Sequence, residues 1–161
     1  MSQSLKTTIV GSYPVPEWLK ASPTPAALQD AIRMVLDTQE RAGIDVIGDG
    51  ELGRWDLQRR EPAGMVERFV RLMAGVQPGL TRRQSEDFLA NPATAYRAKA
   101  PGVVVEELGD GDLDLLREYQ QAKSLTSHSL KFTLTSPYML AKVVVDDHYR
   151  DLERLTMAFA E

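Results

Sequence analysis

The chain has 161 residues, 43% of them apolar and 26% charged, with a formal net charge of −4 and scattered Lys and Arg. This composition is that of a globular domain and argues against nucleic acid as a partner. No apolar run reaches the roughly 20 residues that span a bilayer, residues 1–6 lack an export signal, and cysteine is absent. We therefore expect a cytoplasmic protein without membrane contact, disulfides or thiolate ligands.

The first predicted unit is a strand, a loop and a helix. β-Branched residues predict a strand over residues 6–11, and prolines predict a loop over residues 12–25. Thr24 can cap a helix that begins at Pro25, and Gly43 predicts the end of that helix. Its apolar face, at helical spacing, comprises Leu28, Ile32, Val35 and Leu36.

A second unit follows directly. Residues 44–48 predict a buried strand, residues 48–61 a polar loop, and residues 62–74 a helix that ends at Gly75. The inward side chains of this helix are expected to be Met65, Val66, Phe69 and Met73. Residues 76–98 are predicted to be irregular, with at most one short helix at about 82–90.

Two further units complete the chain. The third has a strand centred on residues 103–105 and a helix that Asp112 can cap, and the fourth has a strand over 130–135. Asp146 or Asp147 is expected to begin the last helix. The inward residues expected for these two helices are Leu115, Leu116, Tyr119 and Ala122, then Tyr149, Leu152, Leu155 and Phe159.

Four strands that each precede a helix predict an α/β fold with a parallel sheet. Four units fit either an open doubly wound sheet or half of an eight-unit barrel. The half-barrel is favoured because polar and glycine-rich residues collect in the strand-to-helix loops. The chain also ends within a predicted helix, and such a barrel needs about 250 residues. We therefore predict a single domain over residues 1–161, about the first four βα units of a (β/α)8 TIM barrel, apparently truncated.

Polar residues follow the first two predicted strands. Gly11 and Ser12 come after the first, and Asp49 and Glu51 flank Gly50 after the second. Because adjacent parallel strands lie about 4.8 Å apart, the two loops should face the same volume. A hydroxyl and free N–H groups can hold an α-carboxylate, and Glu51 an α-ammonium. A solvated loop acid is the alternative for Glu51, while Asp49 could orient its surroundings, bond the loop or be solvated.

Other polar residues give weaker signals. Arg54 and Trp55 could wall a pocket, although Trp55 could equally fill the mouth of a barrel. His128 and His148 lack the spacing of a zinc motif, and structural or solvent-exposed roles are expected for both. No metal-binding or catalytic residue is assigned to this chain.

Three segments together resemble the cobalamin-independent methionine synthase family, specifically its catalytic carboxy-terminal barrel and shorter single-barrel relatives. They are TTIVGSYPVPEWL (7–19), QERAGIDVIGDGELGRWD (39–56) and LKFTLTSPYMLA (130–141). The resemblance implies a (β/α)8 methyltransferase that converts homocysteine to methionine with 5-methyltetrahydrofolate or a related donor. It also implies that Gly11 and Ser12 bind the carboxylate end of homocysteine and that Glu51 binds its ammonium. Asp49 is a further candidate for substrate binding, and the resemblance assigns it no role.

The chain also departs from the family pattern. The family holds zinc through a His-x-Cys pair, a glutamate and a further cysteine of the second half of the barrel, which this chain does not include. Ser136 stands where a glycine is common, and no tryptophan lies nearby, so the methyl donor stays open. The isolated chain is expected to be inactive.

Two alternatives remain open at this stage. One is a zinc-dependent thiol alkyltransferase of the same superfamily that acts on another thiol. The other is a non-catalytic half-barrel that assembles with a second copy or a separate chain through its open strand edges.

Overall fold

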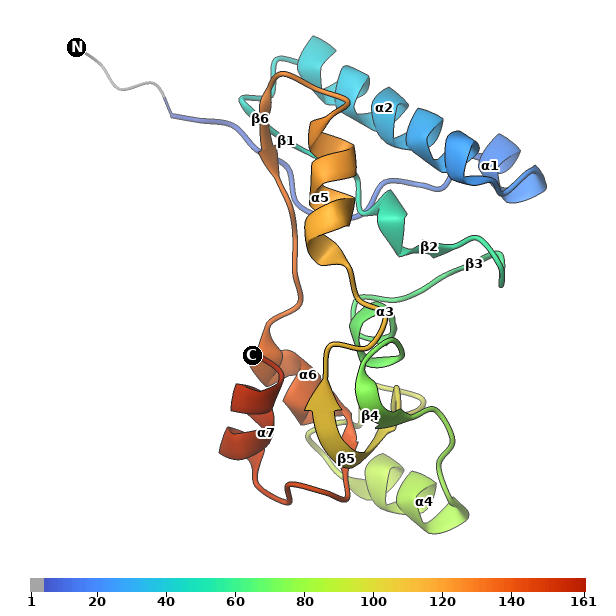
Figure 1. The fold of residues 1–161 in the computed structure, drawn as a ribbon, viewed down its shortest axis with the longest axis vertical. Coiled ribbons are helices and arrows are strands. Elements are labelled where there is room, and N and C mark those ends of the chain that lie inside the picture. Colours follow the sequence, from blue (N-terminus) through green and yellow to red (C-terminus); the bar gives the residue numbers. More distant parts are fainter. Residues whose placement is uncertain (1–4) are drawn as a thin grey trace. The chain divides into compact units, whose positions relative to one another are not determined.

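The computed structural model describes residues 5–161, which form two compact units (Figure 1). The first unit comprises residues 5–63 and 114–134, and the second comprises residues 64–113 and 135–161. Residues 1–4, on which the expectation of no export signal partly rests, lie outside the described residues. Within residues 5–161, no helix is both long and apolar enough to cross a membrane.

The helix α2 (Pro25–Arg41) of the first unit begins and ends as the sequence predicts. Thr24 Oγ1 accepts a hydrogen bond from the Ala27 N–H at 3.1 Å, and Pro25 occupies the first helical position. At the other end Gly43 has a φ of +73°, and its N–H and the next one donate to carbonyls of the last helical turn. Glycine adopts this left-handed conformation without strain, so the predicted stop is confirmed.

The sheet of the first unit is built around β1 (Val46–Gly48). β1 pairs in parallel with β6 (Ser129–Lys131), and Thr8 forms a single parallel bridge to Val46. The predicted strands at 44–48 and 130–135 are thus present but shorter than predicted, and the predicted strand at 6–11 is reduced to the bridge at Thr8. β6 is hydrogen-bonded directly to β1, whereas the predicted strand at 103–105 belongs to another sheet, so the four predicted strands do not form one parallel sheet within the described residues.

The remaining elements of the first unit are short. They are α1 (Glu17–Ala21), the 3-10 turn η1 (Leu52–Arg54), α5 (Leu115–Lys123), and an antiparallel ribbon of β2 (Trp55–Asp56) and β3 (Glu61–Pro62). Asp114, rather than the predicted Asp112, caps α5 by accepting from the Arg117 N–H at 3.1 Å.

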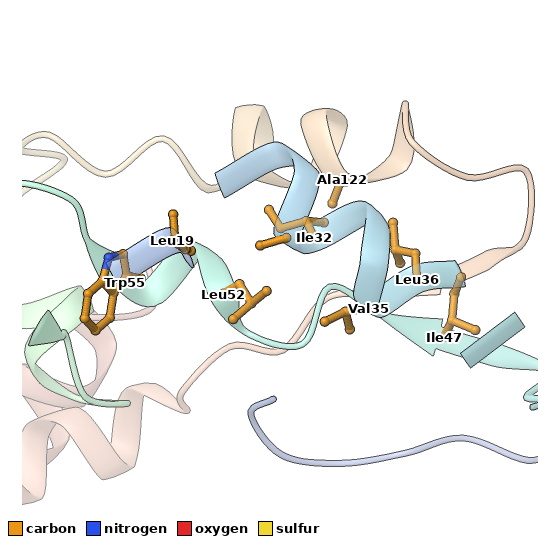
Figure 2. Close-up of a cluster of buried hydrophobic side chains, with 9 residues drawn as sticks. Leu19, Ile32, Val35, Leu36, Ile47, Leu52, Trp55 and Ala122 are labelled. Atoms are coloured by element: carbon orange, nitrogen blue, oxygen red, sulfur yellow. The ribbon is translucent and has the colours of Figure 1, made fainter. Parts of the chain in front are cut away.

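The core of the first unit holds the loop after β1 against α2 (Figure 2). α2 contributes the predicted Ile32, Val35 and Leu36, whereas Leu28 packs at the edge of the cluster. Each such side chain stabilises the fold by roughly 1.5–3 kcal/mol when it is fully buried. The other buried members of the cluster are Leu19, Ala31, Ile47, Leu52, Trp55 and Ala122. Because Ile47, before Asp49, and Leu52, after Glu51, both belong to it, the segment that carries these two acids is fixed on both sides.

The second unit contains a three-stranded sheet with the order β4-β5-β7. β5 (Val103–Gly109) is the predicted third strand, longer than expected, and pairs antiparallel with β4 (Ala74–Gln77) and parallel with β7 (Val145–Asp146). The predicted helix over 62–74 is wrong, because only α3 (Glu67–Val70) is helical there. Gly75, with a φ of +84°, lies at an irregularity of the β4–β5 pairing, where a Cβ would lie 2.5 Å from the Glu107 carbonyl oxygen. It therefore permits a bulge instead of ending a helix.

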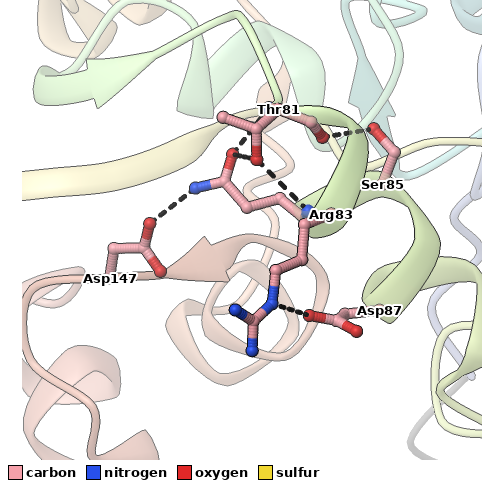
Figure 3. A network of polar contacts seen from close by, with 6 residues as sticks. Thr81, Arg83, Ser85, Asp87 and Asp147 are labelled. Atoms are coloured by element: carbon pink, nitrogen blue, oxygen red, sulfur yellow. Dashed lines mark hydrogen bonds and ion pairs between the residues drawn. The ribbon is translucent and has the colours of Figure 1, made fainter.

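The helix α4 (Arg82–Ala90) matches the predicted short helix at about 82–90. Its first turn is closed by a capping box between Thr81 and Gln84. The Gln84 side chain also donates to Asp147 Oδ2 at 2.5 Å, which ties α4 to the segment after β7 (Figure 3). Arg83 and Asp87, also drawn in Figure 3, form an exposed ion pair with an N···O distance of 3.7 Å, which contributes little to stability.

Three further details of the second unit differ from prediction. Asp151, rather than Asp146 or Asp147, caps α7 (Leu152–Ala158), since Asp146 instead accepts backbone N–H groups in a turn. Ser136 caps α6 (Pro137–Val143), a helix that the prediction lacks although its Ser-Pro start is a helix signal. Met65 is 55% exposed instead of inward.

Candidate functional site

A small depression at the carboxyl end of β1 brings the first two predicted loops together. Its lining residues are Ile9, Gly11, Tyr13, Gln39, Gly48, Asp49, Gly50, Glu51, Lys131 and Thr133. All of them belong to the first unit. The structure therefore places Gly11, Asp49 and Glu51 on one surface, and exposed Ser12 lies next to it without lining it.

Close backbone approach fixes the turn that carries the acids. The Tyr13 N–H donates to the Gly50 carbonyl oxygen at 2.9 Å, which joins the loop after the Thr8 segment to the loop after β1. Gly50 has a φ of +70°, and a Cβ there would lie 2.8 Å from Val35 Cγ1. Glu51 follows with a φ of 57°, an unusual conformation for a residue with a side chain. The packing of Gly50 thus fixes the backbone position from which the Glu51 side chain extends.

Glu51 forms an ion pair with Arg54 of the same turn. Its Oε2 lies 2.6 Å from Nη1 of Arg54, and the two side chains are only 12% and 13% exposed. Nη2 of Arg54 donates to the Thr133 carbonyl oxygen at 3.3 Å, which connects this pair to the segment after β6. A charge-assisted hydrogen bond with so little exposure is stronger than one at the surface. The Glu51 carboxylate is therefore oriented and suited to a positively charged group.

Asp49 is part of the turn rather than a solvated acid. Its side chain is 7% exposed, and Oδ1 accepts the Glu51 N–H at 3.0 Å. Burial raises the pKa of Asp49 above its ordinary value, while this N–H and the charge of Arg54 oppose the rise. Of the three roles considered for Asp49, bonding of the loop agrees with this geometry.

Two residues of the depression escaped the sequence reasoning. Gln39 of α2 is buried, and its amide donates to the Gly48 carbonyl at 2.7 Å and accepts the Gly48 N–H at 2.8 Å. Lys131 of β6 directs its Nζ to Thr8 and Ile9. Two sequence signals could have revealed these residues: Gln39 is a polar residue on the apolar face of α2, and Lys131 is a charged residue within an apolar strand.

The other candidate residues lie outside the depression. Trp55 is buried in the core cluster, so it does not wall the pocket. His128 pairs with Glu40 at 3.0 Å, and His148 is exposed beside Tyr149. Across residues 5–161, no three His, Cys, Asp or Glu side chains are grouped so that they could hold a metal ion. The described residues therefore provide no site for the zinc ion that the family resemblance implies.

Comparisons with known proteins give a consistent result, although no family model matches the chain. Methionine synthases from Sulfurisphaera tokodaii and Saccharolobus solfataricus are 28% and 30% identical over 98% of this chain. A solved B12-independent methionine synthase from a Shewanella species, in complex with selenomethionine, matches 97% of this chain with a TM-score of 0.72 and 25% identity. The chain covers 45%, 46% and 45% of these proteins, respectively, so it spans about half their length. The predicted resemblance and an α/β fold of the TIM-barrel family are thereby confirmed.

Proposed function

We propose that this chain, a relative of the cobalamin-independent methionine synthases over about half their length, holds the amino-acid end of homocysteine in a methyltransferase. Glu51 binds the α-ammonium of the substrate, and Gly11 and Ser12 bind its α-carboxylate. The observation that carries this proposal is the largely buried carboxylate of Glu51, which pairs with the Arg54 guanidinium and lines the same depression as Gly11.

We assign only substrate binding, and neither zinc binding nor methyl transfer, to the described residues. We propose that the chain supplies the first strands of a (β/α)8 barrel, which the partial coverage of its relatives supports. Zinc and 5-methyltetrahydrofolate are implied by the family resemblance alone, so the proposal for this chain concerns substrate binding. Asp49 contributes by fixing the backbone of Glu51.

The Glu51 assignment is tested by the binding of L-methionine, the amino-acid product, to the 161-residue chain. We expect Glu51→Gln to weaken binding about tenfold or more, because a charge-assisted hydrogen bond is replaced by a neutral one. Isothermal titration calorimetry gives the dissociation constant. The desamino analogue of methionine should bind wild type and Glu51→Gln equally weakly, since it has no ammonium.

Glu17→Gln provides a matched control. Glu17 also forms an ion pair three residues along the chain, with Lys20 at 2.6 Å, but its side chain is 87% exposed and does not line the depression. This variant should bind L-methionine like the wild type. An unchanged dissociation constant in a folded Glu51→Gln chain would refute the assignment.

A further inference from the structure

Lys131 is the one lysine among the residues that line the depression. It is the last residue of β6 and lies in register with Gly48 of β1. Its Nζ donates to Thr8 Oγ1 at 2.9 Å and to the Ile9 carbonyl oxygen at 2.5 Å. The side chain therefore extends across β1 to the segment that leads into Gly11 and Ser12.

Neither of the two hydrogen-bond acceptors of Lys131 carries a charge. A hydroxyl and a backbone carbonyl are both neutral, and an ammonium has three N–H donors. Among the described residues these two acceptors occupy two donors, so one N–H is left for a ligand in the depression. Half-buried charges are costly unless they are paired, and a carboxylate would supply both the charge and the third acceptor.

The same depression already contains the carboxylate of Glu51. An amino acid carries its ammonium and its carboxylate on a single carbon, so a site that selects it needs one group of each sign. We infer that Lys131 is a specificity-determining residue whose ammonium binds the α-carboxylate of the substrate, beside the backbone of Gly11. This inference rests on the proposed function and adds a charged partner for the carboxylate.

A lysine that only fastened β6 to the Thr8 segment would act differently. Its loss would weaken every ligand of the depression by the same factor, because the whole site would loosen. Loss of a carboxylate partner weakens only ligands that possess a carboxylate. The comparison of L-methionine with methioninol, in which an alcohol replaces the carboxylate, separates the two roles.

The experiment measures the dissociation constants of L-methionine and methioninol for the wild-type chain and for Lys131→Met. Wild type should prefer L-methionine about tenfold or more, and Lys131→Met should bind the two ligands almost equally. Lys131→Gln, which keeps a donor toward Thr8 but has no charge, should also lose the preference. It serves as the test if circular dichroism shows that Lys131→Met is unfolded.

Lys123→Met is the matched control, since Lys123 likewise donates to a backbone carbonyl, that of His128 at 2.7 Å, and does not line the depression. It should keep the wild-type preference. If the Lys131 variants bind L-methionine and methioninol more weakly by the same factor, this inference is overturned and the Glu51 assignment stays intact. A wild-type chain that binds neither ligand at millimolar concentration would overturn both the Lys131 inference and the Glu51 assignment. If Glu51→Gln weakens methioninol binding but the Lys131 variants keep the preference for L-methionine, the Glu51 assignment is supported and the Lys131 inference is overturned.

Discussion

At the scale of single residues, Asp45 and Asp49 on either side of β1 have pKa values shifted in opposite directions. The backbone N–H and hydroxyl of Thr7 donate to exposed Asp45 at 2.7 and 2.8 Å and lower its pKa. Burial raises the pKa of Asp49, and one N–H and the charge of Arg54 oppose the rise incompletely. Ionisation of Asp45 therefore stabilises the fold, whereas ionisation of Asp49 costs stability.

The first prediction at this scale concerns Asp49→Asn. The folded chain binds the Asp49 proton more tightly than the unfolded chain, so wild type loses stability as pH rises from the ordinary value near 3.9 through the raised pKa. An asparagine still accepts the Glu51 N–H and has no charge. Asp49→Asn should therefore be more stable than wild type at pH 7, and this difference should vanish in acid. Urea unfolding between pH 3 and pH 8 measures it.

Asp45→Asn should show the opposite sign. The lowered pKa of Asp45 contributes stability above the ordinary value, and this contribution is lost as pH falls through the lowered pKa. The variant should be less stable than wild type at pH 7, with a difference that narrows in acid. A destabilised Asp49→Asn chain at pH 7 would contradict the role given to burial.

Residues of the site differ in how far the sequence reveals them. Gly11, Asp49 and Glu51 follow apolar strands directly, so parallel pairing alone predicts that they meet. Lys131 could not be found this way, because its partners belong to a segment more than one hundred residues earlier. Its recognition requires the actual register of β6 against β1.

At the scale of elements, the contact between α2 and β1 depends on Gln39. Its amide satisfies both backbone groups of Gly48, which is the residue just before the acidic turn. Gln39→Ala would remove the Gln39 partners of these partly buried groups and create a cavity, so it should lower the free energy of unfolding by about 2–4 kcal/mol. Chemical denaturation gives the value. Amide exchange of residues 48–51 should also accelerate, because the turn loses its attachment to α2.

Thr38→Ala is the control for this prediction. Thr38 is the neighbouring residue of α2, but it is exposed and its hydroxyl only returns to the Met34 carbonyl at 2.7 Å. This change should stay within about 0.5 kcal/mol of wild type. If Gln39→Ala also changed the free energy of unfolding by no more than about 0.5 kcal/mol, the two hydrogen bonds between Gln39 and Gly48 would not contribute significantly to stability.

α2 was predicted well from local signals, whereas the helix expected over residues 62–74 was overridden by distant pairing and α6 was missed despite its local Ser-Pro start. α2 has a side-chain cap, an apolar face and a glycine stop within its own sequence, so no other part of the chain is needed to recognise it. Residues 74–77 instead pair with β5, where Val76 lies opposite Val104. That pairing overrides the helical spacing of the preceding apolar residues, and β5 belongs to a different sheet from β1.

At the scale of the whole molecule, the sheet around β1 is incomplete. In the described part of the chain, β6 is hydrogen-bonded to β1 alone, which leaves one backbone edge without a strand. Parallel sheets normally have such edges paired or covered. The chain spans about half the length of its relatives. We therefore propose that a complementary half-barrel completes the sheet.

The last prediction follows from this incompleteness. The chain alone, supplied with zinc, homocysteine and 5-methyltetrahydrofolate, should form no methionine, since its described residues offer no metal cluster. Co-expression with the unmatched portion of the Saccharolobus solfataricus methionine synthase should yield a complex that forms methionine, measured by mass spectrometry. The same complex with Glu51→Gln should require at least tenfold more homocysteine for half-maximal rate, because only the ammonium contact is weakened. Turnover by the chain alone, or a stable complex whose homocysteine requirement is unchanged by Glu51→Gln, would contradict the proposed division of the site.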